Sequence, residues 1–276
     1  DQLSDRLSPT NTELCNSYNM IRLTQLLFAI EPRCEYADYV ERVLFNHVLA
    51  AQHPGDARIC YFTPLASGCE KQYEERYGRF ACCTCSSLDS YAKHAEFVYA
   101  HSNDEFFVNL YAASSVTWRD RAVKLQQDTA FPDEETVRIG LTCERPTEFA
   151  LNLRCPAFCE KGLTITLNGA QQPIAARPGS YAVIKRMWQT GDTIELRLPM
   201  SLHVEAMPDN PNRIALFYGP VLLAAGLDVT VTPPDDTLAP ALVPGAQPVT
   251  QAVTPVEGHP LEFTLTGIAR PMDFTL

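Results

Sequence analysis

Cysteines gathered in one short segment are the residues with the clearest capacity for chemistry in this chain. Cys82, Cys83 and Cys85 stand in the run Cys-Cys-Thr-Cys, and a Glu-x-Cys pair, Glu13 and Cys15, lies far upstream. Soft thiolates and one carboxylate can bind a zinc ion in a tetrahedral site. Adjacent cysteines rarely pair with each other, because a vicinal disulfide strains the intervening peptide, whereas both can reach one metal from a sharp turn. We therefore interpret Cys82 and Cys83 as candidate zinc ligands.

Each of these residues also has an ordinary structural explanation. The cysteines could be buried free thiols or members of disulfides, since vicinal cysteines match no zinc-finger spacing. Thr10-x-x-Glu13 matches a capping box, in which the glutamate satisfies backbone amides at a helix start, and spacing alone favours this interpretation. Cys143, Cys155 and Cys159 lie in or between predicted strands. For them packing or a local disulfide is expected.

Four further side chains that could bind ligands are expected to serve the core instead. His47 lies on an apolar helix face, and it and His94 are interpreted as hydrogen-bonded core histidines. Trp188 and Tyr181 could stack on sugar rings, but aromatic residues in β-sandwiches mostly fill the interior. They do not by themselves predict a carbohydrate site.

Composition and charge narrow the classes of partner. The chain has 276 residues, of which 46% are hydrophobic and 20% charged, as in globular proteins. Its net charge of −11 is spread along the sequence, so nucleic acid is not expected as a ligand. No apolar run is long enough to span a membrane, and the segment after Asp1 has no signal-peptide pattern. A cytoplasmic or periplasmic location is favoured, with homo-oligomers expected if apolar helix surface is exposed.

Helical patterns occupy most of the first hundred residues. Residues 12–30 form a broadly apolar run that Pro32 ends, and residues 34–52 restart the pattern, which together predict an αα-hairpin. The segment ICYFTPL (59–65) is β-prone, and a third helix is predicted from about Leu88 to Tyr99.

The period changes to two after residue 103. Predicted strands recur about every ten residues, at 107–109, 137–143, 149–153, 163–167 and 194–198. Asn168-Gly169 is a strong hairpin signal, because both turn positions tolerate positive φ. The spacing favours an antiparallel sandwich over βαβ units. A Pro-rich stretch at about 228–259 is typical of a linker, and a last strand is predicted in LEFTLTGIA.

Several long segments resemble glycoside hydrolase families 127 and 146, the β-L-arabinofuranosidases and their relatives. They are TELCNSYNMIRLTQLLF, YADYVERVLFNHVLAAQ, CYFTPL and FACCTCSSLDSYAKHAEFVYA, followed in order by FVNLY, QQDTAFP, LNLRCPAF, PGSYAVIKRMWQTGDTIELRLPM and ALFYGPVLLA. The resemblance covers roughly residues 12–226. It implies an α+β multidomain fold, the C-terminal part of an (α/α)6 barrel followed by an antiparallel β-sandwich. The expected domains are a partial barrel with the zinc-thiolate site (1–103), a β-sandwich (104–227), and a linker with a terminal β segment (228–276).

The resemblance also implies roles for particular residues. Glu13, Cys15, Cys82 and Cys83 match the ligands of one zinc ion, and Cys82 matches the nucleophile of a retaining glycosidase that removes L-arabinofuranosyl groups. Tyr61 matches a tyrosine that contacts the sugar. The substrate would be an oligosaccharide or glycan that contains arabinofuranosides. The matching general acid/base glutamate falls before Asp1, so this chain alone is expected to hydrolyse little or nothing.

One departure from the family pattern keeps other functions open. Thr84-Cys85-Ser86-Ser87 replaces a glycine-containing turn, which adds a third thiol next to the adjacent pair. Cys85 could replace Glu13 on the metal and give a closed, structural site. The alternatives to an enzyme are therefore a non-catalytic zinc-stabilised fragment or a carbohydrate-interaction module, including a disulfide-rich carbohydrate-binding sandwich.

Overall fold

The computed structural model describes residues 3–66, 69–75, 80–174, 176–226, 241–242, 248–266, 269–270 and 274–275. Contacts divide the chain into two compact units. The first unit holds residues 1–21, 42–91 and 202–276, and the second holds residues 22–41 and 92–201. In the described part of the chain, no helix combines the length and apolar character needed to cross a membrane.

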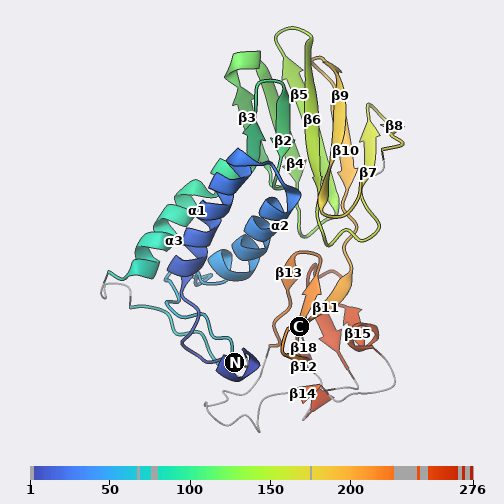
Figure 1. Cartoon of the computed structure of the whole chain (residues 1–276). Helices are drawn as coiled ribbons and strands as arrows, with labels where there is room; N and C mark the ends of the chain where they lie inside the picture. Colours follow the sequence, from blue (N-terminus) through green and yellow to red (C-terminus); the bar gives the residue numbers. More distant parts are fainter. Residues whose placement is uncertain are drawn as a thin grey trace. The chain divides into compact units, whose positions relative to one another are not determined.

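Helices are the main regular structure of the first hundred residues (Figure 1). α1 spans Leu14–Ile30, and α2 spans Cys34–Val43 and runs on into a π-helical segment, Leu44–Leu49. These two elements confirm the helices predicted at 12–30 and 34–52. The segment 59–65, predicted to be β-prone, forms isolated bridges rather than a strand, with Ile59 opposite Gln52.

The third helix starts earlier than the sequence pattern predicts. α3 spans Cys82–Lys93 and is followed by a short 3-10 helix, His94–Phe97. Its first turn contains no large apolar residue apart from the cysteines, which is why the pattern placed the start near Leu88. The helix extends back because Cys83 is buried in the core and the Ser87 hydroxyl donates a hydrogen bond of 2.7 Å to the Cys83 carbonyl.

The second unit contains two sheets. One has the strand order β1-β2-β6-β9 and the other the order β3-β4-β5-β10-β7-β8. The strands of the first are β1 (Tyr99–His101), β2 (Glu105–Val108), β6 (Thr147–Cys155) and β9 (Ser180–Trp188). Those of the second are β3 (Ser114–Trp118), β4 (Val123–Thr129), β5 (Thr136–Cys143), β10 (Thr193–Arg197), β7 (Thr164–Leu167) and β8 (Ala170–Gln171).

The predicted antiparallel pairing holds for most of these strands. The exception is β2 with β6, which run parallel, with Phe106 opposite Leu151. Asn168 and Gly169 both have positive φ, at 50° and 80°, as the predicted hairpin turn requires. Trp118 of one sheet contacts Phe106 and Phe149 of the other, with ring centroids 5.4 and 5.5 Å apart. These contacts make the two sheets a face-to-face sandwich.

The first unit has its own sheets. β11 (Leu202–Met207), β12 (Asn210–Tyr218) and β13 (Val221–Leu222) form one, and β15 (Val253–Pro255), β16 (Phe263–Leu265) and β18 (Phe274–Thr275) form another. A further pair joins β14 (Ala241–Leu242) to β17 (Ala269–Arg270). The strand predicted in LEFTLTGIA is β16. Residues 227–240 and 243–247 of the predicted linker lie outside the described residues.

A buried ion-pair network fixes helix α2 to the sandwich within the second unit. The Arg154 side chain has no exposed surface, and its Nη1 donates to Asp38 Oδ1 at 2.6 Å while its Nη2 pairs with Glu41. Glu41 is only 4% exposed.

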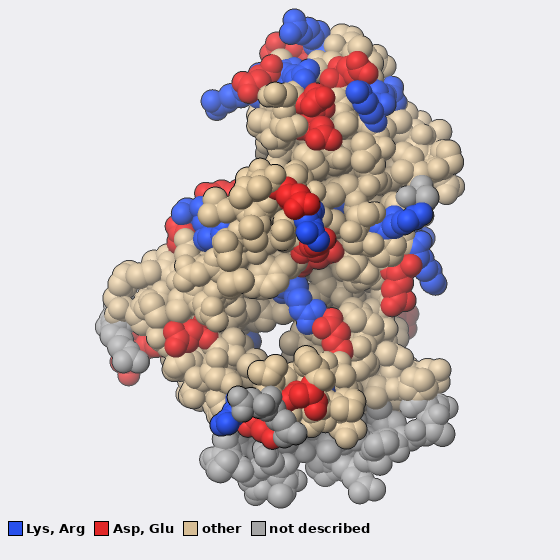
Figure 2. Space-filling view, in the orientation of Figure 1, with Lys and Arg blue, Asp and Glu red and all other residues tan. Residues whose placement is uncertain are grey.

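On the face shown in Figure 2, positively and negatively charged side chains are intermixed.

Candidate functional site

The start of helix α1 positions Glu13 and Cys15. Leu14, the first helical residue, is fully buried in a core cluster that includes Val48 and Cys83, so it anchors the chain at this point. Glu13 precedes the helix and forms a bridge with Phe62. The capping box suggested by the sequence is not formed.

That capping box fails because Thr10 lies well before the helix and its backbone amide donates to Ser8 Oγ at 3.2 Å instead. The Glu13 carboxylate points to sulfur rather than to backbone amides, since Cys15 Sγ donates to its Oε2 at 3.2 Å. The glutamate is therefore available as a ligand rather than as a helix cap.

The start of helix α3 positions the adjacent cysteines. The amides of Thr84 and Cys85 bond to the Ala81 carbonyl at 3.1 and 3.3 Å, which closes the first turn. Cys82 is exposed, whereas Cys83 is only 1% exposed and belongs to the core. The amino end of a helix favours a negative charge, so this position suits a thiolate.

Four ligand atoms converge on one point between these two helix starts. The carboxylate of Glu13 and the sulfurs of Cys15, Cys82 and Cys83 all lie within 4.8 Å of one another. Cys82 Sγ is 3.5 Å from Cys15 Sγ, 4.0 Å from Cys83 Sγ and 3.8 Å from Glu13 Oε2. The fold thus brings the predicted zinc ligands together, although Cys82 lies 67 and 69 positions from Cys15 and Glu13 in the chain.

This donor set fits a zinc ion. Tetrahedral zinc with Zn–S bonds of about 2.3 Å and a Zn–O bond of about 2.0 Å separates its ligand sulfurs by roughly 3.8 Å and sulfur from oxygen by roughly 3.5 Å. The three distances from the Cys82 sulfur lie within a few tenths of an ångström of those values. Three soft thiolates also favour zinc over magnesium or calcium.

Tyr61 reaches into the same cluster from the segment after the isolated bridges. Its hydroxyl lies 3.2 Å from Cys82 Sγ and 3.3 Å from Glu13 Oε2. Its backbone carbonyl lies 3.7 Å from Cys83 Sγ. The residue therefore touches three of the four candidate ligands, at the exposed side of the cluster where a ligand could enter.

The three thiols of the cluster differ in pKa. Hydrogen bonds, first from Tyr61 and then from Cys15, lower the pKa of the Cys82 thiol. Burial, followed by the hydrogen bond to the Glu13 carboxylate, raises the pKa of Cys15 to about 12, and burial also raises the pKa of Cys83. Cys82 is thus the sulfur that most readily becomes a thiolate. A bound divalent cation would deprotonate the other two thiols as well.

The other cysteines and Trp188, also considered from the sequence, lie outside this group or in the core. Cys85 is exposed and is not part of the four-residue group. Cys143, Cys155 and Cys159 are buried free thiols. Trp188 is fully buried and donates through its indole nitrogen to the Phe149 carbonyl at 3.1 Å.

Two predicted core residues have polar partners. His47 is 8% exposed and its Nδ1 lies 2.7 Å from the Ser17 hydroxyl, as expected for a hydrogen-bonded core histidine. The Tyr181 hydroxyl donates to Asn109 Oδ1 at 2.7 Å. The sequence did not indicate the bond from the Tyr18 hydroxyl to Asp89, which ties α1 to α3, because no local pattern links residues 71 positions apart.

Sequence comparison with protein families gives two matches. Residues 1–96 match the catalytic domain, and residues 105–200 the middle domain, of glycoside hydrolase family 127, the β-L-arabinofuranosidases. No curated protein matches the chain.

Solved structures agree with these matches. A family 127 β-L-arabinofuranosidase from Geobacillus stearothermophilus T6 is 29% identical, with a TM-score of 0.66 over 76% of this chain and 36% of that one. Two others share the fold at TM-scores of 0.73. One is a glycoside hydrolase that is 21% identical, and the match covers 98% of this chain and 49% of that one. The other is a family 127 β-arabinofuranosidase that is 20% identical, and the match covers 96% of this chain and 46% of that one.

The chain therefore spans between about a third and a half of the length of these proteins. Both domain matches and the structural neighbours point to one family. The chain belongs to glycoside hydrolase family 127.

Proposed function

We propose that this chain carries the nucleophile and the zinc site of a retaining glycoside hydrolase that removes L-arabinofuranosyl residues from oligosaccharides or glycans. The convergence of Glu13, Cys15, Cys82 and Cys83 within 4.8 Å carries the proposal. Family membership supports the substrate class, because the family 127 neighbours are named as arabinofuranosidases.

Cys82 is the proposed nucleophile. It is the exposed member of the cluster, and its pKa is lowered while that of Cys83 is raised. A zinc ion held by the four residues would keep the thiols ionised at neutral pH. The four groups around the Cys82 sulfur would hold it at the exposed edge of the cluster, where a sugar can approach; they are the Tyr61 hydroxyl, the Glu13 carboxylate and the sulfurs of Cys15 and Cys83.

The reaction is a double displacement. The Cys82 thiolate attacks the anomeric carbon, forming a carbon–sulfur bond as the glycosidic carbon–oxygen bond breaks and the leaving alkoxide takes a proton from a general acid. Water then attacks the same carbon, transfers a proton to a base, and releases arabinose and the Cys82 thiolate. Two inversions leave the anomeric configuration retained. The Tyr61 hydroxyl is proposed to orient the sulfur and contact the sugar.

The domain division is also proposed along the predicted lines. The two family matches leave residues 97–104 between them, which supports a boundary near residue 103 between a partial (α/α)6 barrel and the β-sandwich. Residues 228–276 are proposed to form the linker and terminal β segment.

A substrate with an activated leaving group tests the nucleophile without requiring a general acid. Dinitrophenolate departs unprotonated, so a dinitrophenyl β-L-arabinofuranoside should glycosylate Cys82 even where proton donation is absent. We expect release of dinitrophenolate and a peptide containing Cys82 that is heavier by one pentosyl group. Cys82→Ser should abolish both signals.

The matched control is Cys85→Ser, which removes an exposed thiol from the same helix but outside the four-residue group. It should keep both signals. A pentosyl group on Cys85, or dinitrophenolate release by the Cys82→Ser variant at the wild-type rate, would refute the assignment of the nucleophile.

A second candidate function is a purely structural zinc site. The burial of Cys83 in the core cluster with Leu14 and Cys60 favours it, because a metal there would support folding directly. Under this alternative, chelation lowers the melting temperature while the dinitrophenyl glycoside leaves Cys82 unmodified.

A further inference from the structure

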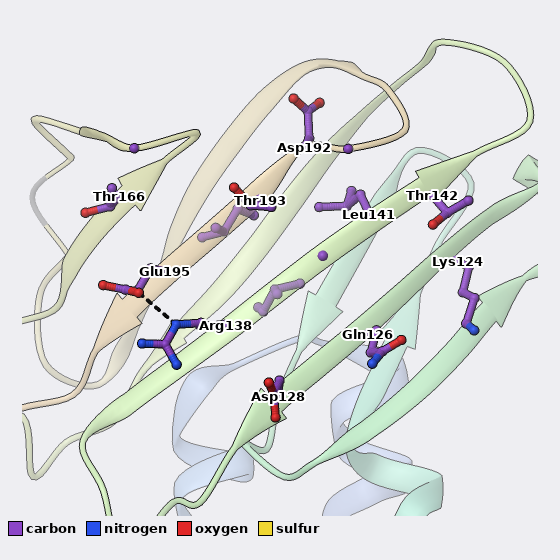
Figure 3. A pocket seen from close by; sticks show the side chains of 15 residues that line it. Lys124, Gln126, Asp128, Arg138, Leu141, Thr142, Thr166, Asp192, Thr193 and Glu195 are labelled. Atoms are coloured by element: carbon purple, nitrogen blue, oxygen red, sulfur yellow. Dashed lines mark hydrogen bonds and ion pairs between the residues drawn. The ribbon is translucent and has the colours of Figure 1, made fainter.

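The outer face of the six-stranded sheet carries a hollow with both polar and apolar side chains in its lining. It has a volume of about 590 Å³ and lies over β4, β5, β10 and β7. None of the residues of the thiol centre lines it; these are Glu13, Cys15, Cys82 and Cys83. Figure 3 shows Lys124, Gln126 and Asp128 along β4 and Arg138 and Glu195 side by side on neighbouring strands. The size lies within the range of small-molecule sites.

Strand register arranges this face in ordered rows. Asp128 lies opposite Arg138, Arg138 opposite Glu195, and Glu195 opposite Thr166, so one row alternates charges and ends in a hydroxyl. The next row is Gln126, Gly140 and Thr193. The hollow is therefore flanked by hydrogen-bonding groups from adjacent strands.

Gly140 forms the low point between those groups. Glycine weakens the interior of a strand and is found there at a bulge, at a tight bend, or where a ligand or another backbone approaches closely. The register of β5 with β4 and with β10 runs without a break through Gly140, so there is no bulge. A Cβ at this position would meet nothing within 4 Å, so no neighbouring backbone requires glycine. The open space above Gly140 therefore leaves room for a ligand to approach the backbone of β5.

The ion pair on this face contributes little to stability. The Arg138–Glu195 pair spans 3.0 Å, and its side chains are 65% and 51% exposed. Ion pairs this exposed contribute little to the free energy of folding. The donors and acceptors that this pair leaves unused are therefore open to a ligand in the hollow.

The chemistry of the face matches a neutral, hydroxyl-rich ligand. Arg138 and Lys124 donate, Asp128 and Glu195 accept, and Gln126 does both, as vicinal sugar hydroxyls require of their partners. Two cations stand against two exposed carboxylates and one buried carboxylate, so the lining is close to neutral, which disfavours a polyanion or a polycation. An oligosaccharide without charged groups offers hydroxyls that can donate to and accept from such side chains.

We propose that this face, centred on Gly140, is a second glycan-binding surface that holds the arabinose-containing glycan whose arabinofuranosyl groups the thiol centre removes. The inference rests on the proposed function for its choice of sugar. The absence of a side chain at Gly140 leaves space for a sugar ring, and the flanking side chains bind the hydroxyls of that ring.

Nuclear magnetic resonance of the full chain provides the test. The ligand is an arabinan-derived oligosaccharide, added to the Cys82→Ser variant so that the glycan is not consumed. Backbone amides of β4, β5 and β10 should shift on titration, and Gly140→Tyr should weaken binding by at least about tenfold. The φ of Gly140 is not positive and its outer face is open, so this variant should fold. A wild-type affinity in Gly140→Tyr would overturn the inference.

Matched variants separate the hollow from a general surface effect. Val183→Tyr places the same ring on an exposed position of the other sheet, and Lys185→Ala removes an exposed charge there. Both should bind as the parent does. The double variant Arg138→Ala/Glu195→Ala should lose affinity as Gly140→Tyr does, and unchanged affinity in it would also count against the hollow.

The titration and the dinitrophenyl glycoside test distinguish failure of the sheet-face inference from failure of the proposed function. Shifts confined to residues around Cys82 would overturn the sheet-face inference and leave the proposed function standing. Shifts on the sheet with no modification of Cys82 by the glycoside would support glycan binding and contradict the proposed catalysis.

Discussion

The hydroxyl of Tyr61 lies 3.2 Å from the sulfur of Cys82, a residue that begins a helix 21 positions further along the chain. This hydrogen bond is the first cause of the lowered pKa of Cys82, and the same hydroxyl lies 3.3 Å from Glu13 Oε2. One phenol therefore contributes to both the ionisation and the position of the proposed nucleophile.

Tyr61→Phe should slow the glycosylation of Cys82. Losing the donor raises the pKa of the Cys82 thiol, so the acidic limb of the pH–rate profile should move to higher pH, with a loss of about tenfold or more at neutral pH. Dinitrophenolate release measured across pH provides the profile. Tyr99→Phe is the control, since its hydroxyl bonds to Ser114 at 3.0 Å and should leave the profile unchanged. An unshifted acidic limb in Tyr61→Phe would contradict this role.

Removing the metal should destabilise the fold. Bound ligand at about a thousand times its Kd stabilises a protein by roughly 4 kcal/mol, so a strong chelator should lower the melting temperature by several degrees. Calorimetry with and without chelator, together with metal analysis, measures this. Cys83→Ser removes a ligand from the core and should abolish the chelator effect. Equal melting temperatures with and without metal in the wild type would show that no metal supports the fold.

Removing the buried guanidinium of Arg154 should destabilise the folded state. Arg154→Met leaves Glu41 buried without a partner, which is expected to reduce the free energy of unfolding by about 3–5 kcal/mol at neutral pH. Burial already raises the pKa of Glu41, against the lowering effect of Arg154. Without Arg154 that pKa rises further, so the folded state binds a proton that the unfolded state has released, and stability falls as pH rises from the unfolded pKa through the folded one. Denaturant unfolding at acidic and neutral pH measures the difference.

The double variant Arg154→Met/Glu41→Gln controls for lost packing. It should recover part of the stability at neutral pH, because no charge then remains uncompensated at position 41. A double variant as unstable as Arg154→Met at every pH would show that packing, rather than the charge of Glu41, determines the loss.

Sequence patterns predicted the helices and strands better than the contacts between them. Apolar periodicity located α1, and alternation located β5 and β6, because burial on one face leaves a local signal. The start of α3 at Cys82 and the parallel pairing of β2 with β6 were missed. Both depend on contacts between distant residues, and single-sequence periodicity does not report such contacts.

The candidate site shows the same limit. Glu13 and the cysteines were identified by residue type and by resemblance, but spacing alone favoured a capping box for Glu13. The structure instead places its carboxylate against Cys15 Sγ and 3.8 Å from the sulfur of Cys82, a residue of α3 that lies 69 positions away in the chain. The sequence did not indicate the hollow at Gly140, because the polar side chains that line it come from several strands.

X-ray absorption spectroscopy of the zinc-loaded chain tests the proposed metal site most directly. The four converging residues predict three sulfur neighbours at about 2.3 Å and one oxygen at about 2.0 Å. The Cys82→Ser variant should lose one sulfur, and Cys85→Ser none. A site of four sulfurs that loses one in Cys85→Ser, or a zinc ion surrounded only by nitrogen and oxygen, would contradict the assignment of Glu13, Cys15, Cys82 and Cys83.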